Sequence, residues 1–225
     1  MLRAILFDFD GTIALSEPMH FAAFAEVLAG RGLVLTEPAY YERYVSLIDR
    51  ECLERMIEDY ARPDLRADLP ALLTAKAEAM ADRLARGVPL CPGVRAFVAR
   101  AAAHAPLAIV SGALRDEIAG VLERAGLDRF FASIVAAEDV PAGKPDPQGY
   151  HLAVERLRAQ TLADLEASQC LAIEDTPKGI AAARAAGMRV IALPHTVRAD
   201  ALGGADRVYP TYDRISWSEL EAMFA

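Results

Sequence analysis

Residues 5–12, with the sequence ILFDFDGT, are the stretch that decides the fold. A short apolar run ends abruptly in two carboxylates, Asp8 and Asp10, and a Gly-Thr pair follows at once. A continuous apolar run of this length is typical of a buried strand in a parallel sheet. In open parallel α/β sheets, ligands bind just beyond the carboxyl ends of the strands. The stretch therefore predicts a site at Asp8 and Asp10, whose side chains point to the same side of the strand.

The composition argues against a membrane or nucleic-acid partner. The chain has 225 residues, of which 54% are hydrophobic, and its net charge is −8. A nucleic-acid partner would need a basic face, whereas a small anionic substrate can still be held by a local group of Lys, Arg and metal. No run approaches the ~20 apolar residues of a spanning helix. The apolar stretch after Arg3 is cut short by Asp8, so it does not form a signal peptide.

The three cysteines Cys52, Cys91 and Cys170 are scattered, and no Cys-x-x-Cys pair occurs. This usage predicts small buried residues in a reducing compartment rather than disulfides or zinc ligands. We therefore expect a soluble cytoplasmic protein, either a monomer or a small homo-oligomer.

A helical lobe is predicted directly after the first strand. Apolar residues repeat at helical spacing up to a long alanine-rich helix over residues 72–86, without any strand pattern. The segment 87–93 is rich in Pro and Gly and is expected to lead back to the rest of the fold. We therefore expect residues 15–87 to form an inserted helical cap, and residues 1–14 and 88–225 to form an α/β catalytic core.

Strands alternate with helices in the second part of the chain. This alternation implies a parallel sheet with right-handed crossovers, that is, a Rossmann-like α/β core. The strands are expected at residues 107–110, 133–137, 170–173 and 189–193, with a short edge strand at Val208.

Polar side chains follow several of these strands. If the strands are neighbours, four carboxylates, a hydroxyl and an ammonium gather in one crevice. Like charges raise one another's pKa, so such a cluster needs a further cation. Mg²⁺ takes oxygen ligands and recruits substrate phosphate, and a carboxylate beside it is a candidate nucleophile that forms an aspartyl-phosphate. The residues concerned are Asp8, Asp10, Ser111, Lys144, Glu174 and Asp175.

The four segments resemble, in order, the motifs of the haloacid dehalogenase-like superfamily, and the resemblance covers the whole chain. Asp-x-Asp-Gly-Thr is matched by residues 8–12, and a Ser that closes an apolar strand is matched by Ser111. A Lys followed by Pro is matched at Lys144, and an acidic pair after a strand is matched by Glu174 and Asp175. The inserted helical lobe looks like the small helical cap of this family.

The resemblance implies a role for each motif. Asp8 would be the nucleophile, and Asp10 would protonate the leaving oxygen and then deprotonate the hydrolytic water. Mg²⁺ would be held by Asp8, by the main-chain carbonyl of Asp10 and by Asp175, with Glu174 nearby. The family's dehalogenases lack the second Asp and need no metal, so dehalogenation is not expected. The phosphate would be bound by Ser111, Lys144 and the amides around Gly112 and Ala113.

Substrate choice is expected to depend on the cap. Glu17 and His20 lie in a segment that resembles the start of the cap in β-phosphoglucomutase-like phosphatases and mutases. In the mutase, a His at this place helps to position the acid/base Asp. Arg50 and Lys76 resemble cap residues that meet the distal groups of the substrate, although solvated helix positions are an equally good interpretation. The residues before Arg50 lack the glycine of the mutase, which weakens the mutase alternative.

We therefore expect a Mg²⁺-dependent phosphatase of small phosphorylated metabolites, most of all of a sugar phosphate. One alternative is β-phosphoglucomutase-like transfer between sugar hydroxyls, and a second is a non-catalytic binding module, which would be expected to have lost some of the motif residues. Arg115 and Lys178 have two possible interpretations: each either contacts the substrate or the acidic pair at the predicted site, or occupies an ordinary solvated position in a helix. The histidines His104, His151 and His195 are interpreted as ordinary surface or helix residues.

Overall fold

The computed structural model describes residues 1–45 and 47–225. The chain divides into two compact units. The first, here called the core unit, consists of Met1–Leu15 and Pro89–Ala225, and the second, here called the helical unit, is Ser16–Val88.

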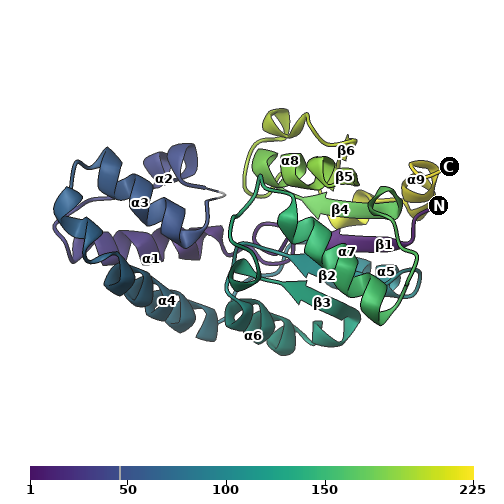
Figure 1. Ribbon diagram of the computed structural model, residues 1–225, viewed down its shortest axis with the longest axis horizontal. Helices are drawn as coiled ribbons and strands as arrows, with labels where there is room; N and C mark the ends of the chain where they lie inside the picture. The colour runs from purple at the N-terminus through teal and green to yellow at the C-terminus, as the bar shows by residue number, and fades with distance from the viewer. Residues whose placement is uncertain (46) are drawn as a thin grey trace. The chain divides into compact units, whose positions relative to one another are not determined.

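The core unit is built on a six-stranded parallel sheet with the order β3-β2-β1-β4-β5-β6 (Figure 1). The order reverses between β1 and β4, and ligands of open α/β sheets bind beyond the carboxyl ends of the strands at such a point. The prediction of a Rossmann-like parallel α/β core is confirmed. The strands are β1 (Ala4–Phe7), β2 (Leu107–Val110), β3 (Phe131–Val135), β4 (Cys170–Glu174), β5 (Arg189–Ala192) and β6 (Arg207–Val208).

Helices cover both faces of this sheet. Leu6 of β1 belongs to the apolar cluster beneath α7 and α8, whereas the ring of Phe7 packs edge-on against Phe97 of α5. Successive strand residues point to opposite faces, so α5 lies on the face opposite to α7 and α8. This double cover explains why β1 is buried at every residue. The helices of the core unit are α5 (Val94–Ala102), α6 (Arg115–Ala125), α7 (Gln148–Gln160), α8 (Pro177–Ala185) and α9 (Trp217–Ala222).

The described residues of the helical unit form four α-helices: α1 (Glu17–Ala29), α2 (Glu37–Arg43), α3 (Asp49–Asp59) and α4 (Leu69–Ala85). No strand occurs among its described residues, 16–45 and 47–88. Its apolar centre includes Phe24, Leu53 and Leu72, and α4 packs against α1 and α3. Within the described part of the chain, no helix has the length and apolar character needed to span a membrane. A cytoplasmic location stays a prediction.

Several element boundaries differ from those expected by one to three residues, and two of these differences have a clear physical reason. Helix α4 begins at Leu69 rather than at residue 72, because Pro70 is accommodated in the first helical turn instead of ending the preceding segment. Strand β3 ends at Val135 rather than at residue 137, because the Asp139 carboxylate accepts the Ala136 amide at 2.8 Å and a short 3₁₀ turn begins there. The three cysteines are free and buried, as predicted.

Candidate active site

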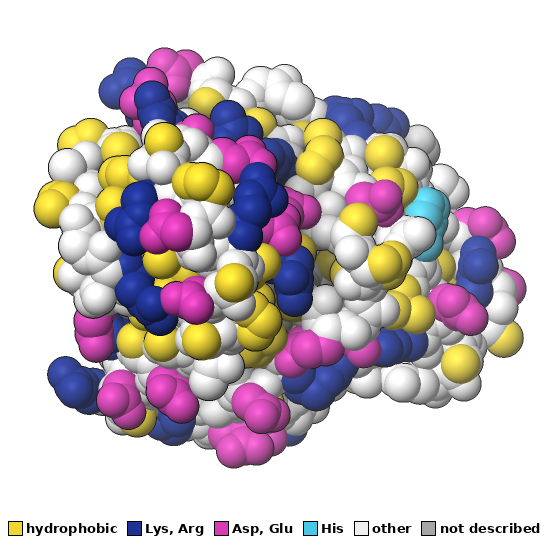
Figure 2. All heavy atoms as spheres, turned by 60° about the vertical axis from the view of Figure 1, so that its left-hand side comes forward, with side chains coloured by type: hydrophobic (Ala, Val, Ile, Leu, Met, Phe, Trp, Pro, Cys, Tyr) yellow, Lys and Arg dark blue, Asp and Glu magenta, His cyan; other side chains and the backbone are white. Residues whose placement is uncertain are grey.

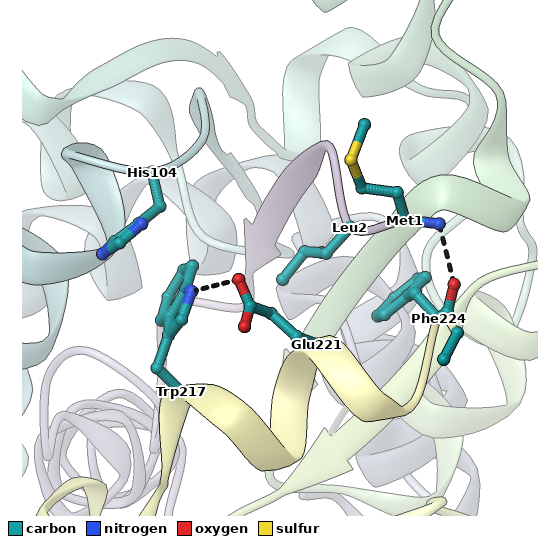
Figure 3. Close-up of a pocket in the computed structure, with 7 residues that line it drawn as sticks. Met1, Leu2, His104, Trp217, Glu221 and Phe224 are labelled. Carbon is teal, nitrogen blue, oxygen red and sulfur yellow. Dashed lines mark hydrogen bonds between the residues drawn. The ribbon is translucent and has the colours of Figure 1, made fainter.

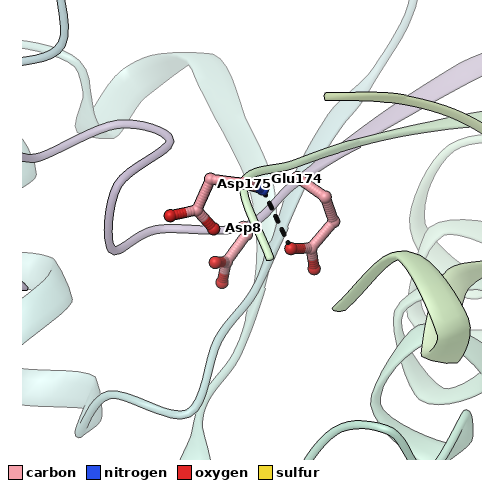
Figure 4. Close-up of side chains that lie close together, drawn as sticks. All are labelled: Asp8, Glu174 and Asp175. Carbon is pink, nitrogen blue, oxygen red and sulfur yellow. Dashed lines mark hydrogen bonds between the residues drawn. The ribbon is translucent and has the colours of Figure 1, made fainter. Parts of the chain in front are cut away.

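Three carboxylates meet where β1 and β4 end. The two strands are paired, Phe7 beside Ile173, and the Asp8 amide continues the ladder by donating to the Ile173 carbonyl at 2.9 Å. Asp8 therefore lies next to Glu174 and Asp175. One carboxylate oxygen from each of the three lies within 4.8 Å of the others, and all three residues are buried (Figure 4).

Asp175 is placed by the start of α8. The Thr176 hydroxyl caps this helix by accepting the Gly179 amide at 3.3 Å, and Pro177 occupies the first turn. Capping and proline both favour a helix start at this point. The chain thus turns from strand to helix immediately after the acidic pair, which keeps Asp175 at the edge of the sheet.

Lys144 brings an ammonium to the cluster from the loop before α7. Its Nζ lies 2.7 Å from Asp8 Oδ1 and 2.6 Å from Glu174 Oε1. Burial alone would lower the pKa of Lys144, but the charges of Asp8 and Glu174 raise it above its ordinary value. Lys144 therefore stays charged between the two carboxylates.

The cluster carries more negative than positive charge. Burial raises the pKa of Asp8 to about 7, and Glu174 and Asp10 act in the same direction, while Lys144 opposes them. Three buried carboxylates around one ammonium leave a surplus of negative charge, which a divalent cation would neutralise.

The donor set fits Mg²⁺. Its side-chain donors are carboxylate oxygens, the hard ligands that this ion prefers. Gly11 leaves room for them: its φ is +69°, and a methyl group there would overlap the Asp175 carboxylate. The residues that the sequence predicts as metal ligands, Asp8, Asp10, Glu174 and Asp175, are thus compatible with Mg²⁺; their roles stay a prediction.

The Glu174 carboxylate is fixed by hydrogen bonds to both of its oxygens and by close packing against α8. Tyr150 of α7 donates its hydroxyl to Glu174 Oε1 at 2.6 Å, and the Asp175 amide donates to Oε2 at 3.3 Å (Figure 4). A methyl group at Gly179 of α8 would overlap the Glu174 carboxylate. Burial raises the pKa of Tyr150 well above its ordinary value, so the phenol remains a donor. Tyr150 and Gly179 were not predicted from the sequence.

His195 is not the ordinary surface or helix residue that the sequence suggested. It lies in the loop after β5, and its Nδ1 is 2.8 Å from the Gly11 carbonyl oxygen. The Gly11 amide in turn donates to the Ala14 carbonyl at 2.7 Å. These two bonds fix the peptides on either side of Gly11 and so orient the loop that carries Asp10, a half-buried residue.

The predicted phosphate-binding segment follows β2, which pairs with β1 on the side opposite to β4. Ser111 is buried, and its Oγ accepts the Ala113 amide at 3.0 Å. A serine hydroxyl that accepts one bond still has its own proton to donate. Gly112 is exposed between them. Ser111 can therefore donate to a phosphoryl oxygen while its own position is fixed.

Arg115, whose role the sequence left open, turns away from Ser111. Its guanidinium pairs with Asp139 and donates to the Ile134 carbonyl at 3.2 Å. Arg156 holds the same carboxylate at 2.8 Å, and hydrogen bonding to Arg156 keeps the pKa of Asp139 below its ordinary value. Arg115 therefore fastens the loop after β3. Lys178 lies half-buried in the first turn of α8.

The predicted cap residues form contacts within the helical unit. Lys76 is 0% exposed; its Nζ lies 2.7 Å from Asp49 Oδ2 and 2.9 Å from His20 Nδ1. The interpretation of Lys76 as a solvated residue is therefore wrong. Glu17 accepts the Tyr40 hydroxyl at 2.5 Å. Arg50 has a 58% exposed side chain, 3.8 Å from Glu54. Contact of any of these residues with a substrate stays a prediction.

A separate cavity of about 400 Å³ lies in the core unit (Figure 3). Met1 and Leu2, which precede β1, form part of its lining together with His104, Trp217 and Glu221. It thus lies toward the amino end of β1, whereas Asp8 follows the carboxyl end. The cavity contains none of the predicted site residues.

The surface carries charges of both signs. On the face shown in Figure 2, Lys and Arg side chains lie among Asp and Glu side chains. Several arginines are paired, among them Arg62 with Asp64 at 2.7 Å and Arg66 with Glu58 at 2.8 Å. The absence of a nucleic-acid partner stays a prediction.

A family model described as haloacid dehalogenase-like hydrolase matches residues 2–187. The chain belongs to this family, and the prediction of a haloacid dehalogenase-like enzyme is confirmed. The chain is 33% identical over 221 residues to protein CbbY of Rhodobacter capsulatus, covering 91% of each chain. It is also 33% identical over 190 residues to fructose-1-phosphate phosphatase YqaB of Escherichia coli, covering 83% of this chain and 94% of that protein. The crystal structure of CbbY from Rhodobacter sphaeroides in complex with phosphate has a TM-score of 0.85 at 28% identity, covering 98% of this chain and all of the other.

Proposed function

We propose that the protein is a Mg²⁺-dependent phosphatase that hydrolyses small phosphorylated metabolites, sugar phosphates above all, through an aspartyl-phosphate on Asp8. The observation that carries this proposal is the buried cluster of Asp8, Glu174 and Asp175 around Lys144, at the point where the strand order reverses. Membership of a hydrolase family supports it. The relative named as a fructose-1-phosphate phosphatase supports the class of substrate.

Asp8 would attack the phosphorus atom of the bound ester. One carboxylate oxygen of Asp8 forms the new P–O bond while the bond to the leaving oxygen breaks, and Asp10 gives that oxygen its proton. Asp10 then takes a proton from a water molecule, whose oxygen attacks the phosphorus and releases inorganic phosphate and free Asp8. General acid–base transfer of this kind contributes ~10²–10⁴-fold in typical enzymes.

The attack requires Asp8 in its ionised form. Lys144, 2.7 Å from Asp8 Oδ1, favours this form and can also contact an oxygen of the incoming phosphoryl group. Mg²⁺, held by Asp8, Asp175 and the main-chain carbonyl of Asp10, would neutralise negative charge on the carboxylates and on the phosphoryl group. Ser111 and the neighbouring amides would bind the remaining phosphoryl oxygens.

Product analysis tests the proposal. Phosphorylated metabolites, including β-glucose 1-phosphate with a trace of the 1,6-bisphosphate, would be incubated with Mg²⁺ or with a chelator, and free phosphate and glucose 6-phosphate would be followed. We expect Mg²⁺-dependent release of phosphate. Glucose 6-phosphate with little free phosphate would favour the mutase alternative, because there a sugar hydroxyl rather than water accepts the phosphoryl group.

The binding-module alternative makes the opposite prediction. It requires folded protein with Mg²⁺ to give neither product from any ester of the panel, and that result would contradict the proposed function. All the motif residues that such a module would be expected to lose are present: Asp8, Asp10, Lys144, Glu174 and Asp175.

A further inference from the structure

Tyr150 is a buried residue that the proposed reaction does not use. Its side chain is 0% exposed and lies in the first turn of α7, among the apolar residues that pack beneath the sheet. Filling the core would require only its ring. Its hydroxyl, however, donates to Glu174 Oε1 at 2.6 Å in the middle of the charged cluster. A phenylalanine would fill the same space without that bond.

The oxygen that accepts from Tyr150 also accepts from Lys144. Lys144 Nζ lies 2.6 Å from Glu174 Oε1 and 5.5 Å from the centre of the Tyr150 ring. The same ammonium lies 2.7 Å from Asp8 Oδ1. Lys144 is thus shared between two carboxylates, and the hydroxyl of Tyr150 competes with it for one of them.

The remainder of Glu174 is fixed. Its Oε2 accepts the Asp175 amide at 3.3 Å, and the carboxylate lies against Gly179, where a methyl group would overlap it. Because Glu174 cannot turn freely, a change in what Oε1 accepts changes how strongly it draws Lys144. Without the hydroxyl, Oε1 would draw Lys144 more strongly, at the expense of Asp8 and of any phosphoryl group beside it.

We propose that Tyr150 is a positioning residue for Lys144: by donating to Glu174 Oε1, it leaves the ammonium available to Asp8 and to the phosphoryl group of the substrate. This inference rests on the proposed phosphatase function. It assigns Tyr150 an effect on phosphate binding that a purely structural core residue would not have.

The first experiment compares Tyr150→Phe with the wild type. Calorimetry with orthophosphate in the presence of Mg²⁺ gives the Kd, and circular dichroism and the melting temperature report folding. A hydrogen bond to a charged group contributes enough for about a tenfold change, so we expect the orthophosphate Kd to rise about tenfold and the half-saturating Mg²⁺ concentration to change little. An unchanged Kd in folded Tyr150→Phe would overturn the inference.

Tyr209→Phe is the matched control. Tyr209 also donates its hydroxyl to a glutamate, Glu219 of α9, at 3.2 Å, but neither residue belongs to the cluster. Its removal should leave the orthophosphate Kd unchanged. An equal weakening in both variants would show a general effect of losing a phenol hydroxyl, and would also overturn the inference.

A double-mutant cycle tests whether Tyr150 acts through Lys144. In a Lys144→Met background, Tyr150→Phe should have no further effect on kcat/KM, because the ammonium that it positions is absent. Effects that multiply independently would contradict the inference. If the wild type neither binds orthophosphate nor releases it from any ester, the proposed function is overturned, and this inference with it.

If Tyr150→Phe does not fold, a second variant tests the same inference. Incorporation of 3,5-difluorotyrosine at position 150 keeps the ring and hydroxyl and makes the phenol a stronger donor. The orthophosphate Kd should then fall below that of the wild type. An unchanged or higher Kd in the folded fluorinated protein would overturn the inference.

Discussion

Lys76 of the helical unit, which is buried, and Lys144 of the core unit, which is half-buried, differ in the charge around them. Lys76 Nζ lies 2.7 Å from the Asp49 carboxylate and 2.9 Å from the His20 imidazole. Lys144 Nζ lies within 2.7 Å of two carboxylates, Asp8 and Glu174, and Asp175 adds a third to the same cluster.

The two lysines therefore differ in charge balance: the charge around Lys76 is balanced, whereas the group around Lys144 carries excess negative charge. One ammonium and one carboxylate balance, so the group around Lys76 needs no further ion. The group around Lys144 has carboxylates in excess, and an unbalanced buried charge is costly unless another charge joins it. The surplus of negative charge therefore supports the proposal that the core cluster, rather than the pair in the helical unit, binds a cation and carries out the reaction.

The largest expected effect comes from removing the proposed nucleophile. Asp8→Asn should lower kcat by at least about 10⁴-fold, because an amide cannot form the aspartyl-phosphate. Asp49→Asn, the corresponding change beside Lys76, should lower kcat far less. Steady-state assays with Mg²⁺ measure both, with circular dichroism to check folding. Activity retained in folded Asp8→Asn would exclude Asp8 as the nucleophile.

Replacing each lysine distinguishes the two clusters by their response to metal. Lys144→Met and Lys76→Met each break a buried pair, which typically costs ~3–5 kcal/mol of unfolding free energy; the cost at Lys76 should lie at the low end, because the Asp49 side chain is 25% exposed. Mg²⁺ should restore much of the stability of Lys144→Met, since it replaces the lost charge, and none of that of Lys76→Met. Urea denaturation with Mg²⁺ or a chelator measures this. Equal recovery in both variants would contradict the charge argument.

The charged residues of the core cluster were predictable because each carries a local signal. Asp8, Glu174 and Asp175 end or directly follow apolar runs, and Lys144 precedes a proline in a loop between a strand and a helix. Parallel strands bring such positions to one edge of the sheet. Knowledge of the strand order was therefore not needed to list these residues.

Tyr150, Gly179 and His195 carry no such signal. Tyr150 and Gly179 lie within helices. They contact the Glu174 carboxylate only because α7 and α8 pack around it. The contact of His195 with Gly11 joins residues 184 positions apart. The sequence alone shows Lys76 only as one position in an amphipathic helix. Its burial depends on the packing that brings Asp49 of α3 against α4. Such contacts exist only in the packed chain.

The pH dependence of the unfolding free energy tests the excess negative charge of the carboxylates around Lys144. The pKa of Asp8 is raised from 3.8 to about 7 in the folded metal-free protein, so between these values the folded chain binds more protons than the unfolded chain. The stability that Asp8 contributes should therefore fall as the pH rises through this window, by up to about 4 kcal/mol. Denaturation at about pH 5 and pH 8 in chelator should show a smaller decline for Asp8→Asn than for the wild type. Identical declines would mean that Asp8 does not carry the surplus.

The smallest expected effect comes from replacing Gly179, which lies against the Glu174 carboxylate of the Lys144 cluster. Gly179→Ala places a methyl group where the Glu174 carboxylate lies, and such overpacking typically costs ~1–3 kcal/mol. Displacement of Glu174 should also release Lys144 and raise the half-saturating Mg²⁺ concentration. Gly120→Ala in α6 is the matched control: its methyl group would meet only the flexible end of Arg124, at 3.4 Å, so it should raise helix stability by roughly 0.5–1 kcal/mol and leave Mg²⁺ dependence unchanged. A Gly179→Ala enzyme with wild-type Mg²⁺ dependence would show that the position of Glu174 does not control the cation site.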